Sequence, residues 1–313
     1  MGALDWLLDS DSAIRWQAMR DLTAAHAEAL SLERDRVPHE GLGAEILGRQ
    51  QPDGSWRRDD APVCKTTLFT MQLLRTTGID PANPAVKSAA AHLEAGLRWN
   101  NQGGRWELRA LETGGSAAMH QWRRSCVGGV LRTPDRDPRA PPCRRATRGG
   151  GWNCEAPKST RSSFHTTICV LEGLLEYERA VGPAPEVVSS RRMGEEYLLQ
   201  RALFRRLSTG EIANPEFLVL AFPPRCHYDV LRGLDYFRAA GLAPDARVGD
   251  AVRVIESKRQ ADGRWLLDAR YDEGIAAPSG ERVGEPSRWN TLRALRVIRW
   301  YERSCLEQKG KGG

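Results

Sequence analysis

Three short stretches of the chain hold side chains that can transfer protons. Cys154 and Glu155 follow a tryptophan, His165 lies in a serine- and threonine-rich stretch, and residues 227–229 are His-Tyr-Asp. A carboxylic acid beside aromatic rings can protonate an alkene and stabilise the resulting cation through the ring faces. The candidate catalytic residues are Asp229, Glu155, His165 and Tyr228, and the candidates for substrate binding are Cys154, Thr166, His227, Trp289 and Asn290.

The same residues also have a purely structural interpretation. Thr66, Thr166, Asp229 and Asn290 stand at the starts of stretches with helical periodicity. A polar side chain at such a place commonly caps the unpaired N–H groups of a helix. The charged residues around Glu155 would then join neighbouring loops through hydrogen bonds, and Trp289 would pack in the core.

A repeated phrase predicts the elements that position these residues. Gln51-Pro-Asp-Gly-Ser-Trp56 and Gln260-Ala-Asp-Gly-Arg-Trp265 are nearly identical, and Gly149-Gly-Gly-Trp152 is a partial third copy. Asp-Gly is a turn signal because glycine reaches positive φ without steric cost. Each full copy follows an amphipathic stretch, at residues 42–49 and 251–258. We therefore expect each tryptophan to fix a turn between two helices.

The stretches after the turns repeat as well. Those that begin near residues 66, 166, 228 and 290 carry apolar residues at spacings of three and four, the period of a helix with one buried face. Such self-similarity is typical of stacked helix pairs. Because strand signals are nearly absent, the sequence predicts an all-α fold. Residues 4–22 resemble a HEAT-type hairpin, which leaves an open α-solenoid that binds a partner as an alternative.

The Gln-x-x-Asp-Gly-x-Trp phrase resembles the glutamine-tryptophan motif of squalene and other terpene cyclases. Trp152-Asn-Cys-Glu155, Ser163-Phe-His-Thr-Thr167 and residues 227–236 are similar to short actinobacterial proteins described as squalene cyclases. The resemblance covers nearly the whole chain apart from residues 105–148. It implies a single (α/α) toroid domain over residues 1–304, in which inner helices surround an apolar cavity for an isoprenoid-type ligand.

The resemblance implies three alternative functions. Cyclases of the squalene-hopene type use an Asp-x-Asp-Asp acid that this chain lacks, so a terpene cyclase would rely on Asp229 or Asp235, the acids best placed by position. A noncatalytic toroid or solenoid that binds an apolar ligand or peptide is the second. The third is a zinc-dependent prenyltransferase-like enzyme. The β subunits of protein prenyltransferases are also toroids, and by resemblance their zinc-binding histidine corresponds to His165. Cys154, Glu155 and His227 would be further zinc ligands, although no spacing rule requires them. We predict no resident cofactor.

Residues 105–148 differ from the rest of the chain. They contain ten Arg, no Lys and four prolines, and they follow neither the helical nor the strand period. One interpretation is a disordered insertion. The other is a frame error that begins between residues 107 and 118 and ends before Trp152. Read from the second codon base with permitted codons, residues 119–148 become a helical sequence that ends in the glutamine missing from the third copy.

The charge of the chain is concentrated in that segment. The chain has 46 Lys and Arg against 40 Asp and Glu, and the segment accounts for the whole excess of six. The remainder is neutral, which argues against a nucleic-acid partner. Seven cysteines without paired spacing and the absence of a signal peptide predict a cytoplasmic protein. We expect no transmembrane segment and a flexible tail from residue 305; peripheral membrane contact and the oligomeric state stay open.

Overall fold

The computed structural model describes residues 2–100, 105–108, 147, 149–155, 159–277 and 279–310. Within these residues the chain is helical apart from one β-hairpin, which confirms the predicted all-α class. The elements in chain order are α1 (Ala3–Leu8), α2 (Ser12–Leu22), α3 (Ala27–Asp35), α4 (Gly41–Gly48), α5 (Val63–Thr77), α6 (Pro84–Gly96), β1 (Leu97–Asn100), β2 (Arg105–Leu108), α8 (Phe164–Val181), α9 (Pro185–Leu199), η1 (Pro215–Leu218), α10 (Val230–Ala239), η2 (Ala246–Val248), α11 (Gly249–Ser257) and α12 (Arg288–Gly310).

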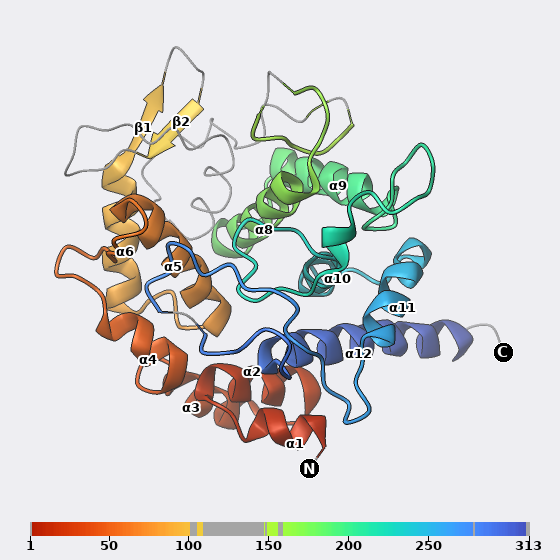
Figure 1. Cartoon of the computed structure of the whole chain (residues 1–313), viewed down its shortest axis with the longest axis horizontal. Coiled ribbons are helices and arrows are strands. Elements are labelled where there is room, and N and C mark those ends of the chain that lie inside the picture. Colours follow the sequence, from red (N-terminus) through yellow and green to blue (C-terminus); the bar gives the residue numbers. More distant parts are fainter. Residues whose placement is uncertain are drawn as a thin grey trace.

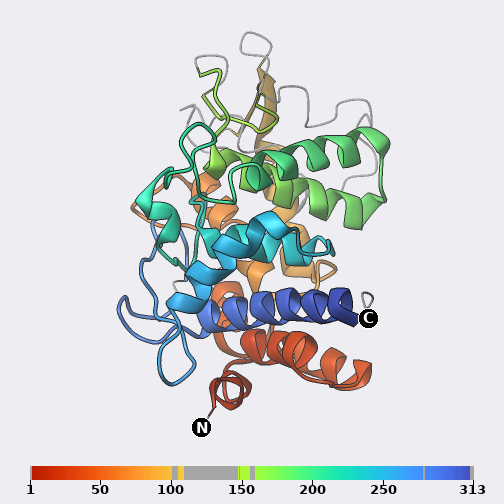
Figure 2. The same cartoon turned by 90° about the vertical axis from the view of Figure 1, so that its right-hand side faces the viewer.

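Helices adjacent in sequence pack as pairs, and the pairs follow one another around a ring-like path (Figure 1). The pairs α5–α6, α8–α9 and α10–α11 are each in contact, and α12 packs against both α10 and α2. Figure 2 shows α12 beside the N-terminal helices, so the two ends of the helical path meet. Five helices, α2, α5, α8, α10 and α12, lie on the inner side and line one pocket.

The repeated phrases form the same turn three times. In each copy the N–H of the first residue donates to the carbonyl four residues later, from Gln51 to Ser55, from Thr147 to Gly151 and from Gln260 to Arg264. The glycine in each turn has a φ near 80°, with values of 83°, 85° and 82° at Gly54, Gly150 and Gly263. The predicted turns are therefore confirmed, and Thr147 takes the position of the glutamine in the partial copy.

Each turn delivers its tryptophan to the helix that follows. The backbone N–H groups of Trp56, Trp152 and Trp265 donate to the hydroxyls of Thr67, Thr167 and Thr291. The indole N–H groups of Trp56 and Trp265 donate to carbonyls ten residues upstream, at Ile46 and Ile255, over 2.7 Å each. Both rings are wholly buried.

Trp152 lacks the second of these bonds. Its indole Nε1 is buried and has no hydrogen-bond partner within the described part of the chain. The position ten residues upstream is Pro142, which lies outside the described residues. The proposed frame error also falls almost entirely outside them, and it stays a hypothesis.

Two described elements reach into segments that were predicted to be irregular or flexible. Residues 105–108, at the start of the Arg-rich segment, form strand β2, which pairs antiparallel with β1. Neighbouring backbone groups can pair in this way even where side-chain alternation is weak. Helix α12 runs to Gly310, whereas the tail was predicted from residue 305. Glu307, Gln308 and Lys309 are good helix formers, and they allow the last turns to continue. No helix among the described residues is long and apolar enough to cross a membrane.

Candidate functional site

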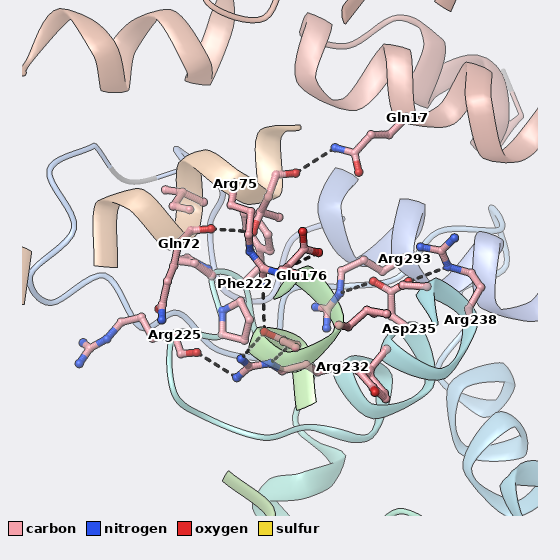
Figure 3. A pocket seen from close by; sticks show the side chains of 18 of the residues that line it. Gln17, Gln72, Arg75, Glu176, Phe222, Arg225, Arg232, Asp235, Arg238 and Arg293 are labelled. Atoms are coloured by element: carbon pink, nitrogen blue, oxygen red, sulfur yellow. Dashed lines mark hydrogen bonds and ion pairs between the residues drawn. The ribbon is translucent and has the colours of Figure 1, made fainter. Parts of the chain in front are cut away.

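A pocket of about 220 Å³ lies among the five inner helices and the loop that precedes α10 (Figure 3). Helices α2, α5, α8, α10 and α12 each place at least two residues in its wall, and residues 222–225 supply the loop side. The charged residues of the wall are Arg20, Arg75, Glu172, Glu176, Arg179, Arg225, Arg232, Asp235, Arg238, Arg293 and Arg296.

One wall of the pocket is built around Asp235 on α10. Its carboxylate pairs with Arg296 of α12, whose Nε donates to Oδ1 over 2.7 Å, and with Arg238, whose Nε donates to the same oxygen over 2.9 Å. Burial acts to raise the pKa of Asp235, but Arg296 and Arg238 hold that pKa well below its ordinary value. Asp235 is therefore a carboxylate at neutral pH and joins α10 to α12.

The opposite wall is built around Glu172 on α8. Arg232 of α10 donates to both of its oxygens, from Nε over 2.7 Å and from Nη2 over 3.0 Å. Arg75 of α5 reaches the same carboxylate over 3.1 Å. Burial opposes ionisation, yet Arg232 and Arg75 lower the pKa of Glu172. This bidentate ion pair links three inner helices.

Positive charge exceeds negative charge in this pocket. The wall holds eight arginines and three carboxylates. Three further acids, Asp21, Asp229 and Glu273, pair with these arginines from behind the wall. Arginines still outnumber carboxylates by eight to six, and burial raises the pKa of Asp229, although Arg293 acts to lower it. The pocket is therefore suited to an anion.

Three polar groups of the wall have unused hydrogen-bonding capacity. Nη1 of Arg293 donates to the carbonyl of Ala221 over 3.2 Å, but its Nη2 and Nε approach only carboxylates at 3.7 and 4.0 Å. Within the described residues, Nε of Arg225 and Oε1 of Gln72 are buried without a hydrogen-bond partner. Buried polar groups are nearly always paired, so these atoms are available to bind a polar ligand or water.

The remaining wall is apolar. Phe222 stacks on Trp289 with ring centroids 4.6 Å apart and an interplanar angle of 10°. The guanidinium of Arg225 lies 4.3 Å from the ring centroid of Phe69, and Ile275 completes this side. The wall therefore combines charged with apolar side chains, and the apolar cavity for an isoprenoid-type ligand stays a prediction. Apart from Arg225, the arginines of the wall lie on helices. The apolar residues of these helices follow the helical period only on the face that packs against the outer layer.

None of the nine residues predicted as site residues lines this pocket. Asp229 is the N-cap of α10, where its Oδ1 accepts the backbone N–H of Arg232 over 2.7 Å. Glu155 is exposed, and its backbone N–H donates to Asn153. Asn290 donates to the carbonyls of Leu220 and Leu266. These are structural contacts, as the capping interpretation expects, and the catalytic roles stay predictions.

Some of the predicted residues do come together at the start of α8. His165 accepts the backbone N–H of Tyr228 at Nδ1 over 2.8 Å, and its ring centroid lies 5.9 Å from that of His227. The hydroxyl of Tyr228 donates to the carbonyl of Leu203. Thr166 accepts the backbone N–H of Cys154. The described residues contain no group of three or more His, Cys, Asp or Glu side chains that could hold a metal ion.

His227 provides a test of this cluster through pH. Its ring stacks on Tyr271 with centroids 3.6 Å apart, and burial together with His165 lowers its pKa from 6.5 to about 4. Between pH 6.5 and 4 the unfolded chain binds a proton that the folded protein excludes. The stability due to neutral His227 is therefore complete above pH 6.5 and is lost toward pH 4.

We expect wild-type protein to lose about 1–2 kcal/mol more than His227→Gln across this range, after allowance for solvent screening. Urea unfolding at several pH values measures the difference. His39→Gln, at an exposed histidine, should behave like the wild type. Equal losses in wild type and His227→Gln would contradict the assigned environment.

The sequence contained a signal for the pocket that its apolar periodicity concealed. Each of three inner helices carries two charged residues three or four positions apart within an apolar stretch: Glu172 and Glu176, Arg232 and Asp235, and Arg293 and Arg296. Such spacing places both side chains on one helix face. Charges of opposite sign on neighbouring repeats could have indicated an inner face lined by ion pairs.

Comparison with known proteins supports the fold alone. No protein-family model matches the chain. No curated protein is similar to it. A solved structure of a protein from Actinoplanes matches with a TM-score of 0.51, at 14% sequence identity, over 96% of this chain and 97% of that one. At this identity the likeness extends to the overall fold, which this chain shares with the Actinoplanes protein across nearly its full length.

Proposed function

We propose that the protein is a noncatalytic (α/α) toroid that binds a small anion in the pocket among its inner helices. The observation that carries this proposal is the excess of arginine over carboxylate in the wall and directly behind it, eight to six. Arg293 is the central residue because it is buried and two of its three nitrogens make no hydrogen bond with the described residues. An anion would complete that guanidinium.

The same wall argues against terpene cyclisation in this pocket. A carbocation is stabilised by carboxylates and aromatic faces, whereas a wall with more guanidinium groups than carboxylates would repel it. The volume of about 220 Å³ is also below the roughly 300–1,000 Å³ of pockets that hold drug-sized ligands. A ligand smaller and more polar than a triterpene fits these properties.

Titration calorimetry with inorganic phosphate and with acetate at low ionic strength tests the proposal. We expect saturable binding of at least one of these anions and a loss of tenfold or more in Arg293→Met. Arg293→Lys, which keeps the charge without the planar fork, should retain part of the affinity. Arg253→Met, at an arginine that is 71% exposed and remote from the pocket wall, is the matched control.

The outcomes separate clearly. Binding of neither anion to the wild type would overturn the proposal. Unchanged affinity in Arg293→Met, with helicity like that of the wild type by circular dichroism, would do the same. If Arg293→Met does not fold, the affinity of Arg293→Lys decides, because a ligand held by the planar fork must bind this variant more weakly.

A further inference from the structure

The geometry points to a specific ligand class for this pocket: a carboxylate joined to a small aromatic body that carries a hydroxyl group at its far end. This inference rests on the proposed function and narrows it. It uses three features of the wall that the charge excess alone does not explain. These are the edge of Arg293 that makes no hydrogen bond, the apolar surface around Phe222 and the unpaired Oε1 of Gln72.

One edge of the Arg293 guanidinium selects the anion. Nη1 donates to the carbonyl of Ala221, whereas Nη2 and Nε form only the longer ion pairs with Asp229 and Asp235, at 3.7 and 4.0 Å. Nη2 and Nε are the two nitrogens that donate in parallel to a carboxylate. A monocarboxylate matches this geometry and would take the place of the longer contacts of Arg293 with Asp229 and Asp235, while Asp235 keeps Arg296 and Arg238 and Glu172 keeps Arg232.

The apolar surface selects the body of the ligand. Phe222 is held flat by its stack on Trp289, and it lines the pocket together with Phe69 and Ile275. Aromatic rings pack well against such a surface in offset or edge-to-face arrangements. The pocket volume of about 220 Å³ allows one ring with a short chain rather than a fused polycycle.

The amide of Gln72 selects the group at the far end. Gln72 lines the pocket from α5, and in the view of Figure 3 it lies across Phe222 from Arg293. Its Oε1 is buried and has no hydrogen-bond partner within the described chain. A hydroxyl both donates and accepts, so it satisfies the amide in either orientation. A purely apolar end would leave the amide unpaired, which is costly.

A panel of three carboxylates tests the inference by calorimetry: acetate, 3-phenylpropionate and 3-(4-hydroxyphenyl)propionate. We expect affinity to rise in that order, with about a tenfold gain from the hydroxyl. In Gln72→Met the two aromatic acids should bind equally, because the hydroxyl has lost its partner. Gln200→Met, at a partly exposed glutamine on the outer layer that does not line the pocket, should keep the tenfold difference.

The possible results distinguish this inference from the proposed function. Acetate or phosphate binding without any gain from the aromatic body overturns the ligand class and leaves the anion site standing. Equal binding of the two aromatic acids to wild-type protein overturns the role of Gln72 and with it the hydroxyl. Absence of binding by every anion overturns both proposals.

Discussion

Asp235→Asn is expected to lower the free energy of unfolding by about 3–5 kcal/mol at neutral pH, the usual cost of breaking a buried ion pair. Asp235 is 15% exposed and pairs with Arg238 and with Arg296, which is 10% exposed. The variant leaves these guanidinium groups, and the nearby Arg293, without their shared carboxylate. Urea unfolding at pH 7 measures the change.

The control for this prediction is Asp245→Asn. Asp245 also pairs with an arginine, Arg247, over 2.7 Å, but these side chains are 34% and 41% exposed. Exposed pairs contribute less than about 1 kcal/mol. A loss in Asp235→Asn that does not exceed the control would contradict the structural role of the pair.

The pH dependence of this pair has a definite sign. The pKa of Asp235 is held below its ordinary value of 3.8. Its ionised carboxylate therefore adds to the free energy of unfolding above that pH, and this stabilisation is lost as the pH falls further. The difference between wild type and Asp235→Asn should therefore shrink in strong acid. If the pocket binds anions, added phosphate should stabilise Asp235→Asn more than the wild type.

Trp265→Ala is the second substitution with a large expected effect, about 3–5 kcal/mol. The ring is wholly buried in the third turn, and its removal leaves a cavity and takes from the Ile255 carbonyl one of its two donors, the other being the backbone N–H of Lys258. The neighbouring helices cannot close the cavity without breaking the bond between the Trp265 backbone and Thr291. Urea unfolding followed by circular dichroism measures the loss.

Two phenylalanine variants separate the ring from its N–H group. Trp265→Phe keeps most of the apolar volume but removes the indole donor from the Ile255 carbonyl, which keeps the backbone N–H of Lys258, at a cost of about 0.5–1.5 kcal/mol beyond the packing change. Trp152→Phe removes an indole N–H that has no partner among the described residues, so it should cost less. A larger loss in Trp152→Phe would mean that this N–H is satisfied in solution.

The helices and turns were predictable because local residues determine them. Gly54 and Gly263 adopt the positive φ that Asp-Gly requires, and the tryptophans follow at a fixed distance. The same logic explains why Thr147 replaces glutamine without loss of the turn. The hydrogen bond that all three turns share is donated by a backbone N–H, and the side chains of Gln51 and Gln260 are exposed.

The pocket was harder to predict because it depends on contacts between distant repeats. Arg296 meets Asp235 from 61 positions away, and Glu172 meets Arg232 from 60. Apolar periodicity identifies the face of a helix that packs outward, but it cannot tell whether the opposite face meets solvent or a charged pocket. Asp229 and Asn290 were predicted as site residues because a polar side chain at the start of a helix can either cap that helix or belong to a site.

The meeting of α2 and α12 has a consequence for how the protein folds. Arg296 donates to Gln17 over 3.1 Å across a sequence separation of 279 residues, and Arg288 donates to the carbonyl of Asp9 across 279. Contacts between residues so far apart in sequence cost the entropy of closing a long stretch of chain, so they form late in folding. Helical hairpins can therefore assemble one after another during synthesis, whereas α2 must wait for the last helix to emerge from the ribosome.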